Sequence, residues 1–183
     1  MPHRTRGKEP NWSYRLMALS YRFRDARSPR EPILAEAGIC EGDTVLDFGC
    51  GPGSYVVPTA RIVGPGGHVY ALDIHPLALR MTEDRARKAG LTNVSTIHSG
   101  LATGLKAESV DVALLYDVFH GLERPDAVLL ELHRVLKPTG LLSVHDHHLD
   151  WSMLTEAIES TALFRLIERG ALTLWFTPQR AGT

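Results

Sequence analysis

Two acids and a glycine-rich loop are the residues of this sequence whose types and spacing are best suited to chemistry. A short apolar run ends in Asp47, and Gly49, Gly51 and Gly53 follow at alternate positions. Glycine has no side chain to keep a ligand away, so a strand that turns into such a loop lets a ligand lie against the backbone. The pattern predicts a ligand site at the end of a buried parallel strand.

A second acid, Asp73, ends the next apolar run. In open α/β sheets, nucleoside ligands bind at the carboxyl ends of neighbouring strands. A P-loop is excluded because Ser54-Tyr55 follows Gly53 in place of Lys-Ser/Thr, and a dinucleotide fingerprint would require glycine at position 54. Asp47 would repel a pyrophosphate but attract an ammonium group. We therefore favour S-adenosylmethionine, with Asp47 towards its amino acid end and Asp73 accepting from the ribose hydroxyls.

Four segments in a fixed order carry a family resemblance. They are Val45–Gly53, Asp73, Asp111–His120 and Leu132–Leu142, the last of which is similar to an "RVLKPGG" segment. From about Ile33 onwards, the chain resembles the class I S-adenosylmethionine-dependent methyltransferases, especially the small-molecule branch that includes the ubiquinone/menaquinone methyltransferases. The resemblance implies a three-layer, doubly wound α/β fold of the Rossmann-like kind. Its seven-stranded, mostly parallel sheet has the order 3-2-1-4-5-7-6, with strand 7 antiparallel.

Apolar runs and helical periodicity alternate along the chain as this fold requires. We expect strands at residues 44–48, 68–73, 93–98, 110–115, 141–144, 164–168 and 172–177, and helices at 33–37, 54–63, 76–89, 125–135 and 151–160. Residues 64–67 and 137–140 are expected to be turns. Residues 33–183 would form one domain, preceded by a helical cap or lid at 1–32 whose apolar spacing predicts a helix over Trp12–Arg24.

The resemblance implies a set of cofactor-binding residues at the carboxyl ends of the strands. They are Asp47, Gly49, Cys50, Gly51, Gly53, Asp73, Ile74, Gly100, Leu101, Tyr116 and Asp117. One position departs from the family pattern, because Gly100 stands where many relatives have an acid that contacts adenine. Backbone groups near Gly100 and Leu101, or the Ser99 hydroxyl, would then recognise adenine instead.

Several histidines and acids follow the fourth and fifth strands. Asp117 would lie where acceptor and cofactor meet, and His120 and His147 are candidates for a general base or an acceptor contact. The alternative for His120 is a locally bonded residue at the start of a helix. Together with His145 and His148 these residues form one rim. No metal is predicted, because consecutive residues at a strand end point in alternating directions.

Composition and charge set limits on the function. Residues 1–30 hold eight basic and two acidic residues, although the whole chain has a net charge of −1. We expect a cytoplasmic enzyme without a membrane span, with both cysteines reduced and a small-molecule methyl acceptor; a homodimer is compatible with the sequence. Two alternatives stay open: an RNA methyltransferase that uses the basic N-terminus, and a non-catalytic protein that binds S-adenosylmethionine.

Overall fold

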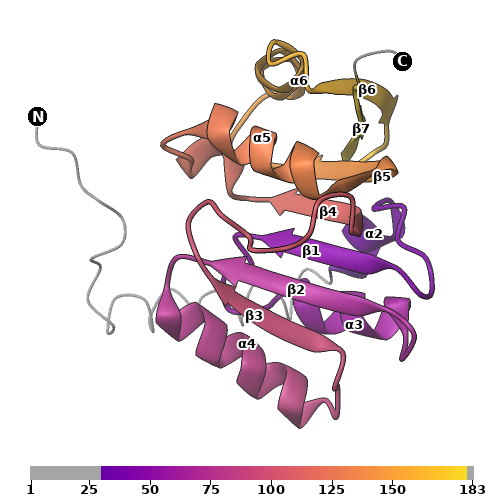
Figure 1. Cartoon of the computed structure of the whole chain (residues 1–183), viewed down its shortest axis with the longest axis vertical. Coiled ribbons are helices and arrows are strands. Elements are labelled where there is room, and N and C mark those ends of the chain that lie inside the picture. Colours follow the sequence, from indigo (N-terminus) through magenta and orange to yellow (C-terminus); the bar gives the residue numbers. More distant parts are fainter. Residues whose placement is uncertain (1–29, 181–183) are drawn as a thin grey trace, which may run out of the picture.

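Seven strands form a single sheet in the computed structural model, which describes residues 30–180. The strands are β1 Thr44–Phe48, β2 His68–Asp73, β3 Val94–His98, β4 Val110–Tyr116, β5 Leu136–His145, β6 Phe164–Arg169 and β7 Leu174–Pro178. Their order is β3-β2-β1-β4-β5-β7-β6 (Figure 1). Strands β1 to β5 run parallel, and β7 is antiparallel to both β5 and β6. The predicted order and the antiparallel seventh strand are confirmed.

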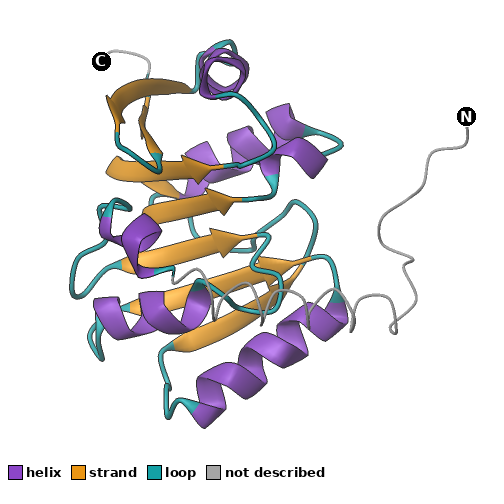
Figure 2. Ribbon diagram, turned by 180° about the vertical axis from the view of Figure 1, so that it is seen from behind, coloured by secondary structure: helices purple, strands orange, loops and turns teal. Residues whose placement is uncertain are grey.

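Helices cover both faces of this sheet, which confirms the predicted three-layer architecture. They are α2 Glu31–Ala35, α3 Val56–Val63, α4 Pro76–Lys88, α5 Pro125–Val135 and α6 Trp151–Glu159, with a 3-10 helix, η2, at Phe119–Gly121. One apolar cluster joins the sheet to α5 and α6, and a second joins its other face to α2, α3 and α4. In Figure 1, α5 lies in front of β4 and β5, whereas Figure 2, seen from behind, has α2 and α3 in front.

Burial explains why these segments take these forms. Val56, Ala60 and Val63 lie on one side of α3 at helical spacing and are fully buried, while the intervening Arg61 is exposed. Strand β1 lies in the middle of the sheet between β2 and β4, and its residues 45–48 are all buried. A central parallel strand covered on both faces accounts for the continuous apolar run of the sequence, and it makes the acid at Asp47 exceptional.

The predicted turn at residues 137–140 is wrong, because these residues lie within β5. Val110 of β4 pairs with Leu136, whereas Val112 pairs with Leu141, so two steps along β4 match five along β5. The extra residues are accommodated in this irregularity of the ladder, where Pro and Gly are tolerated. Turn-forming residues therefore mark a distorted register within the strand and not a boundary between helix and strand.

Smaller differences concern the ends of elements. The first helix begins at Glu31, so it crosses the predicted division between residues 32 and 33, and its Ile33 and Leu34 pack in the core. The helix expected from residue 54 begins at Val56, and the last strand begins at Leu174. The helix predicted over Trp12–Arg24, with most of the cap, lies outside the described residues. Between residues 30 and 180, no helix is long and apolar enough to cross a lipid bilayer.

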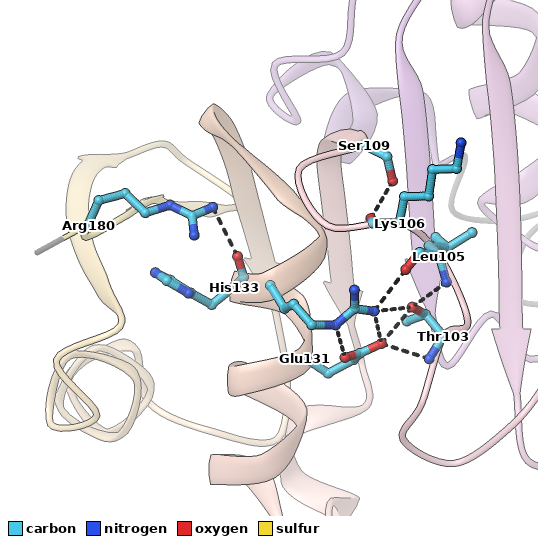
Figure 3. A network of polar contacts seen from close by, with 8 residues as sticks. Thr103, Leu105, Lys106, Ser109, Glu131, His133 and Arg180 are labelled. Atoms are coloured by element: carbon cyan, nitrogen blue, oxygen red, sulfur yellow. Dashed lines mark hydrogen bonds and ion pairs between the residues drawn. The ribbon is translucent and has the colours of Figure 1, made fainter.

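A polar network fastens the long connection between β3 and β4 to helix α5 (Figure 3). Glu131 accepts hydrogen bonds from the backbone and the hydroxyl of Thr103, at 2.9 and 2.6 Å, and from Arg134 at 2.7 and 2.8 Å. Arg134 also donates to the carbonyl of Leu105. Hydrogen bonds from Arg134, and then from Thr103, hold the pKa of Glu131 at about 2, below its ordinary value of 4.5. The network fixes the loop that follows the candidate adenine-binding residues.

We predict that Glu131→Gln lowers the free energy of unfolding by about 1 kcal/mol at pH 7, after allowance for solvent screening. The folded-state pKa is depressed, so this contribution is present above about pH 4.5 and is lost as the pH falls towards 2. Urea unfolding at pH 7 and pH 3 measures the effect. Asp84→Asn, which removes an exposed partner of Arg87 on α4, is the control and should change stability little. A Glu131→Gln effect of equal size at both pH values would contradict the prediction.

Candidate functional site

The glycine loop after β1 folds back against the end of β2. The backbone amides of Gly49 and Cys50 both donate to the carbonyl of Leu72, at 2.8 and 2.9 Å, and Gly53 donates to the carbonyl of Cys50. Gly49, Gly51 and Gly53 all have positive φ, at +82°, +53° and +81°. The alternation of glycine in the sequence is therefore a requirement of the backbone, which is left-handed at every second residue.

Two of these glycines also allow close packing, and the third borders open space. A Cβ atom on Gly49 would lie 2.6 Å from Val118 Cγ2, just after β4, and one on Gly53 would lie 2.7 Å from Thr82 Oγ1 on α4. A Cβ on Gly51 would meet nothing within 4 Å. The loop is thus held against β4 on one side and α4 on another, with open space at Gly51 next to its backbone.

Asp47 is a buried carboxylate with an unsatisfied oxygen. Its residue is only 2 % exposed, and its Oδ2 has no hydrogen-bond partner among residues 30–180. Burial, reinforced by the nearby negative charge of Asp73, raises the pKa of Asp47 to about 7. Burying an ionisable carboxyl group without a full set of hydrogen bonds destabilises a protein. Such a group in a core position is typical of a site that a positively charged ligand completes.

Asp73 organises the turn beside this loop. One oxygen accepts from the backbone of Gly51 at 2.9 Å, and the other accepts from the backbone of His75 at 2.7 Å. Burial raises the pKa of Asp73, although these hydrogen bonds oppose the effect. The N-cap of α4 is not Asp73 but His75, whose Nδ1 accepts from the backbone of Leu77. Asp73 therefore joins the glycine loop to the end of β2, where the predicted ribose contact would be made.

Cys50 contributes to the loop as a buried thiol. Its Sγ lies 3.5 Å from the carbonyl of Gly51 and 4.0 Å from the hydroxyl of Thr82. Burial, followed by the charges of Asp47 and Asp73, raises the pKa of the Cys50 thiol well above its ordinary value, so it stays protonated. Both cysteines are free, and Cys40 is exposed. An inert thiol of this kind packs and does not act as a nucleophile.

The predicted adenine-binding residues lie together at the ends of β2 and β3. Ile74 is 46 % exposed, and a Cβ on Gly100 would lie 2.8 Å from its Cγ2. Ser99 Oγ accepts from the backbone of Leu101 at 3.1 Å, and the Leu101 side chain packs against the core. An acidic side chain at position 100 would require Ile74 to move. The presence of glycine instead of an acid at position 100 is therefore consistent with the close packing of the exposed Ile74 side chain against it.

Tyr116, the last residue of β4, is turned into the core. It is 3 % exposed, its hydroxyl lies 2.8 Å from Ser143 Oγ, and its ring packs edge-on against Tyr55 at 4.9 Å. Burial raises the pKa of its hydroxyl well above the ordinary value. The Tyr116 side chain thus packs against Tyr55, at the end of the glycine loop. A contact between Tyr116 and a cofactor stays a prediction.

Asp117 follows β4 in a strained conformation. Its φ is +55°, which is uncommon outside glycine, and its backbone amide donates to the carbonyl of His145 at 2.7 Å. Its Oδ1 accepts from His147 Nδ1 at 2.7 Å, and His145 Nε2 lies 3.8 Å away. An unfavourable backbone conformation of this kind persists only where the surrounding structure fixes it, and such residues are frequent at functional sites. The structure therefore brings together Asp117 and His147, two of the three predicted catalytic residues.

His120, the third, is paired with a different carboxylate. Asp146 Oδ2 lies 2.9 Å from His120 Nδ1 and also accepts from the His120 backbone at 3.0 Å. The ring of His148 lies between the two pairs, with centroids 4.2 Å from His120 and 3.8 Å from His147. His120 lies in the helix η2, but its side chain is bonded to a carboxylate that follows β5, 26 residues away, and not to a local group as the alternative expected.

Asp146 is bonded to the candidate base His120, and it was not among the site residues expected from the sequence. It follows β5 and is 2 % exposed. The available signal was an acid among three histidines, but the sequence does not show which of two neighbouring acids each histidine contacts. Across residues 30–180, no group of three or more His, Cys, Asp or Glu side chains has the geometry to hold a metal ion.

The sheet order, the glycine loop after β1 and the acid after β2 together define a Rossmann-like methyltransferase fold. Comparison with known proteins agrees with this class. The family described as "Methyltransferase domain" matches residues 39–171, and the chain belongs to that family.

Individual relatives support the same placement. The chain is 31% identical over 120 residues to a demethylmenaquinone methyltransferase of Geobacillus kaustophilus, which covers 65% of this chain and 51% of that protein. It is 29% identical to a ubiquinone/menaquinone biosynthesis C-methyltransferase of Burkholderia cenocepacia, over 69% of this chain and 52% of that protein. The chain therefore spans about half the length of these curated relatives.

A solved structure matches more completely. The crystal structure of a SAM-dependent methyltransferase from Aquifex aeolicus superposes with a TM-score of 0.76 at 26% sequence identity. The match covers 87% of this chain and 98% of that one. Most of this chain and nearly all of that protein therefore share one fold.

We predict that Asp47→Asn stabilises the protein at high pH. The pKa of Asp47 is raised in the folded state to about 7, so its burial costs stability progressively as the pH rises from about 4 to 7. The variant should unfold with a free energy about 2 kcal/mol higher at pH 8 and nearly unchanged at pH 4. Urea unfolding at the two pH values tests this. A variant less stable than the wild type at pH 8 would show that Asp47 has a stabilising partner.

Proposed function

We propose that this protein transfers a methyl group from S-adenosylmethionine to a small-molecule acceptor. The observation that carries the proposal is the buried Asp47 carboxylate, whose unsatisfied oxygen belongs to β1, directly before the loop that has open space at Gly51. A buried carboxylate with one unsatisfied oxygen fits a ligand with a cationic end. The match to the methyltransferase domain family supports the same ligand.

The residues around the loop fit the two ends of this cofactor. Asp47 would face its ammonium group, and the glycine backbone would approach its amino acid portion. Asp73, at the end of β2, would accept from the ribose hydroxyls, and the exposed Ile74 beside Gly100 would pack against adenine. The bound cofactor supplies an electrophilic methyl carbon, and the protein's part is to orient the acceptor and exclude water.

The acceptor would lie on the rim formed by Asp117, His120 and His147. This rim lies next to the glycine loop, because Gly49 packs against Val118, the residue after Asp117. The relatives named as quinone-pathway methyltransferases favour a small molecule over RNA. Catalytic roles for these three residues and a cytoplasmic location are predictions from the sequence, with which a homodimer is compatible.

Calorimetric titration tests the cofactor assignment directly. We expect the wild-type protein to bind S-adenosylmethionine and S-adenosylhomocysteine, but not NAD, which serves as the control ligand. Asp47→Asn and Asp73→Asn should each weaken binding about tenfold or more, because each removes a charge-assisted hydrogen bond. Asp84→Asn, on the exposed side of α4, should bind as the wild type does. Unchanged affinity in both site variants would refute the assignment, and no binding by the wild type would refute the proposed function.

A further inference from the structure

The side chain of His120 is fixed by a fully buried carboxylate. Asp146 has no exposed side-chain surface, whereas His120 has 26 %. The Nδ1 atom of His120 lies within hydrogen-bond distance of both oxygens of Asp146, at 3.1 and 2.9 Å. A carboxylate only accepts hydrogen bonds, so Nδ1 must carry the hydrogen and the lone pair of the neutral ring lies on Nε2.

Asp146 is held in its ionised form by its surroundings. Burial by itself would raise the pKa of Asp146, but hydrogen bonds from the His120 backbone and ring and from the His148 backbone lower it overall. Both carboxylate oxygens are used, since Oδ1 accepts from the His148 amide at 3.0 Å and Oδ2 accepts from the His120 amide. The carboxylate therefore fixes the position, the tautomer and the plane of the His120 ring at once.

The other nitrogen of His120 is available for proton transfer. Among residues 30–180, Nε2 of His120 forms no hydrogen bond, and the ring of His148 packs beside the His120 ring with 4.2 Å between their centroids. The second pair of the rim is less constrained, because 52 % of the His147 side chain is exposed. Of the two Asp–His pairs, Asp146–His120 has the geometry of a general base oriented by a buried acid.

We propose that His120 is a general base oriented by Asp146, and that the methyl acceptor is therefore a protic compound, a phenol or an enol that reacts at oxygen or carbon. This inference rests on the proposed function. The O–H bond of the acceptor breaks and its proton passes to Nε2 of His120. In reaction at oxygen, the electron pair left on oxygen forms the new bond to the methyl carbon. In reaction at carbon, the pair left on oxygen forms a C=O bond, the acceptor carbon later loses its hydrogen to water, and the electrons of the neighbouring C=C bond form the new bond to the methyl carbon. That carbon leaves the cofactor's sulfur, which keeps the electrons of the old bond, and the proton on His120 passes to water.

This arrangement distinguishes between classes of acceptor. A thiol is already partly ionised near neutral pH and reacts without a strong base. A phenolic hydroxyl has a pKa near 10, so it requires a positioned base. A fixed base with a free Nε2 would be superfluous for a thiol, whereas a hydroxyl depends on it.

The tautomer of His120 provides a test that needs no turnover. Nitrogen-15 NMR of the histidine rings in the full chain should show His120 with hydrogen on Nδ1 at a pH where the ring is neutral. Asp146→Asn should shift this ring towards the Nε2–H form, while the circular dichroism spectrum and the affinity for S-adenosylmethionine stay close to those of the wild type. An Nε2–H tautomer in the wild type would overturn the inference, as would an Nδ1–H tautomer that persists in Asp146→Asn.

Turnover then tests the class of acceptor with two probes, 1,4-dihydroxynaphthalene and dithiothreitol, by formation of S-adenosylhomocysteine. We expect methylation of the dihydroxynaphthalene to fall on the order of 10²–10⁴-fold in His120→Gln, with S-adenosylmethionine affinity changed less than about threefold. Asp146→Asn should lower kcat on the same probe more than it raises KM. The matched control is His68→Gln, which removes an imidazole at the start of β2, bonded to Ser95.

The outcomes separate this inference from the proposed function. A wild-type protein that binds no S-adenosylmethionine refutes the proposed function. A wild-type protein that binds it but methylates only dithiothreitol, or neither probe, refutes the protic acceptor and leaves the cofactor assignment in place. A full rate on dihydroxynaphthalene in His120→Gln refutes the role of His120.

Discussion

The buried carboxylate of Asp47 is the constraint on which the site depends. Asp47 is the next-to-last residue of β1 in the middle of the sheet, is buried, and keeps one oxygen without a hydrogen-bond partner in the described chain. Such a group destabilises the fold unless a cation completes it. The surrounding loop cannot relax to supply a partner, because its left-handed glycines and its contacts with Val118 and Thr82 fix the backbone. The unsatisfied Asp47 carboxylate therefore makes the site favour a ligand with a positive charge.

The glycine loop also brings two chemical regions together. Gly49 packs against Val118, which lies between Asp117 and the helix that carries His120. The candidate cofactor-binding residues of β1 and β2 thereby lie next to the rim that follows β4 and β5. Parallel strands whose carboxyl ends meet at one edge make this arrangement possible without any added domain. The rim then contains two Asp–His pairs with different exposure, and in the more buried pair hydrogen bonds hold the pKa of Asp146 below its ordinary value.

Polar groups in the rest of the chain have a supporting function. The network of Glu131, Arg134 and Thr103 holds the connection between β3 and β4 against α5, where the chain has no helix between those strands. The hydroxyl of Tyr116 is bonded to Ser143 beneath the loop. These contacts are satisfied, in contrast to Asp47, and they keep the candidate site rigid.

The sequence by itself determined the strand order, the glycine loop and its two acids. Each of these depends on local signals: apolar runs that end in an acid, alternating glycines, and a known order of motifs. The tertiary structure alone decided that Asp146 pairs with His120 and Asp117 with His147, because 26 and 30 residues separate the partners and two acids compete for three neighbouring histidines. It also decided that residues 137–140 lie within β5, since only pairing with β4 reveals the shifted register. Local residue types set which elements form, and the juxtaposition of strand ends sets which side chains meet.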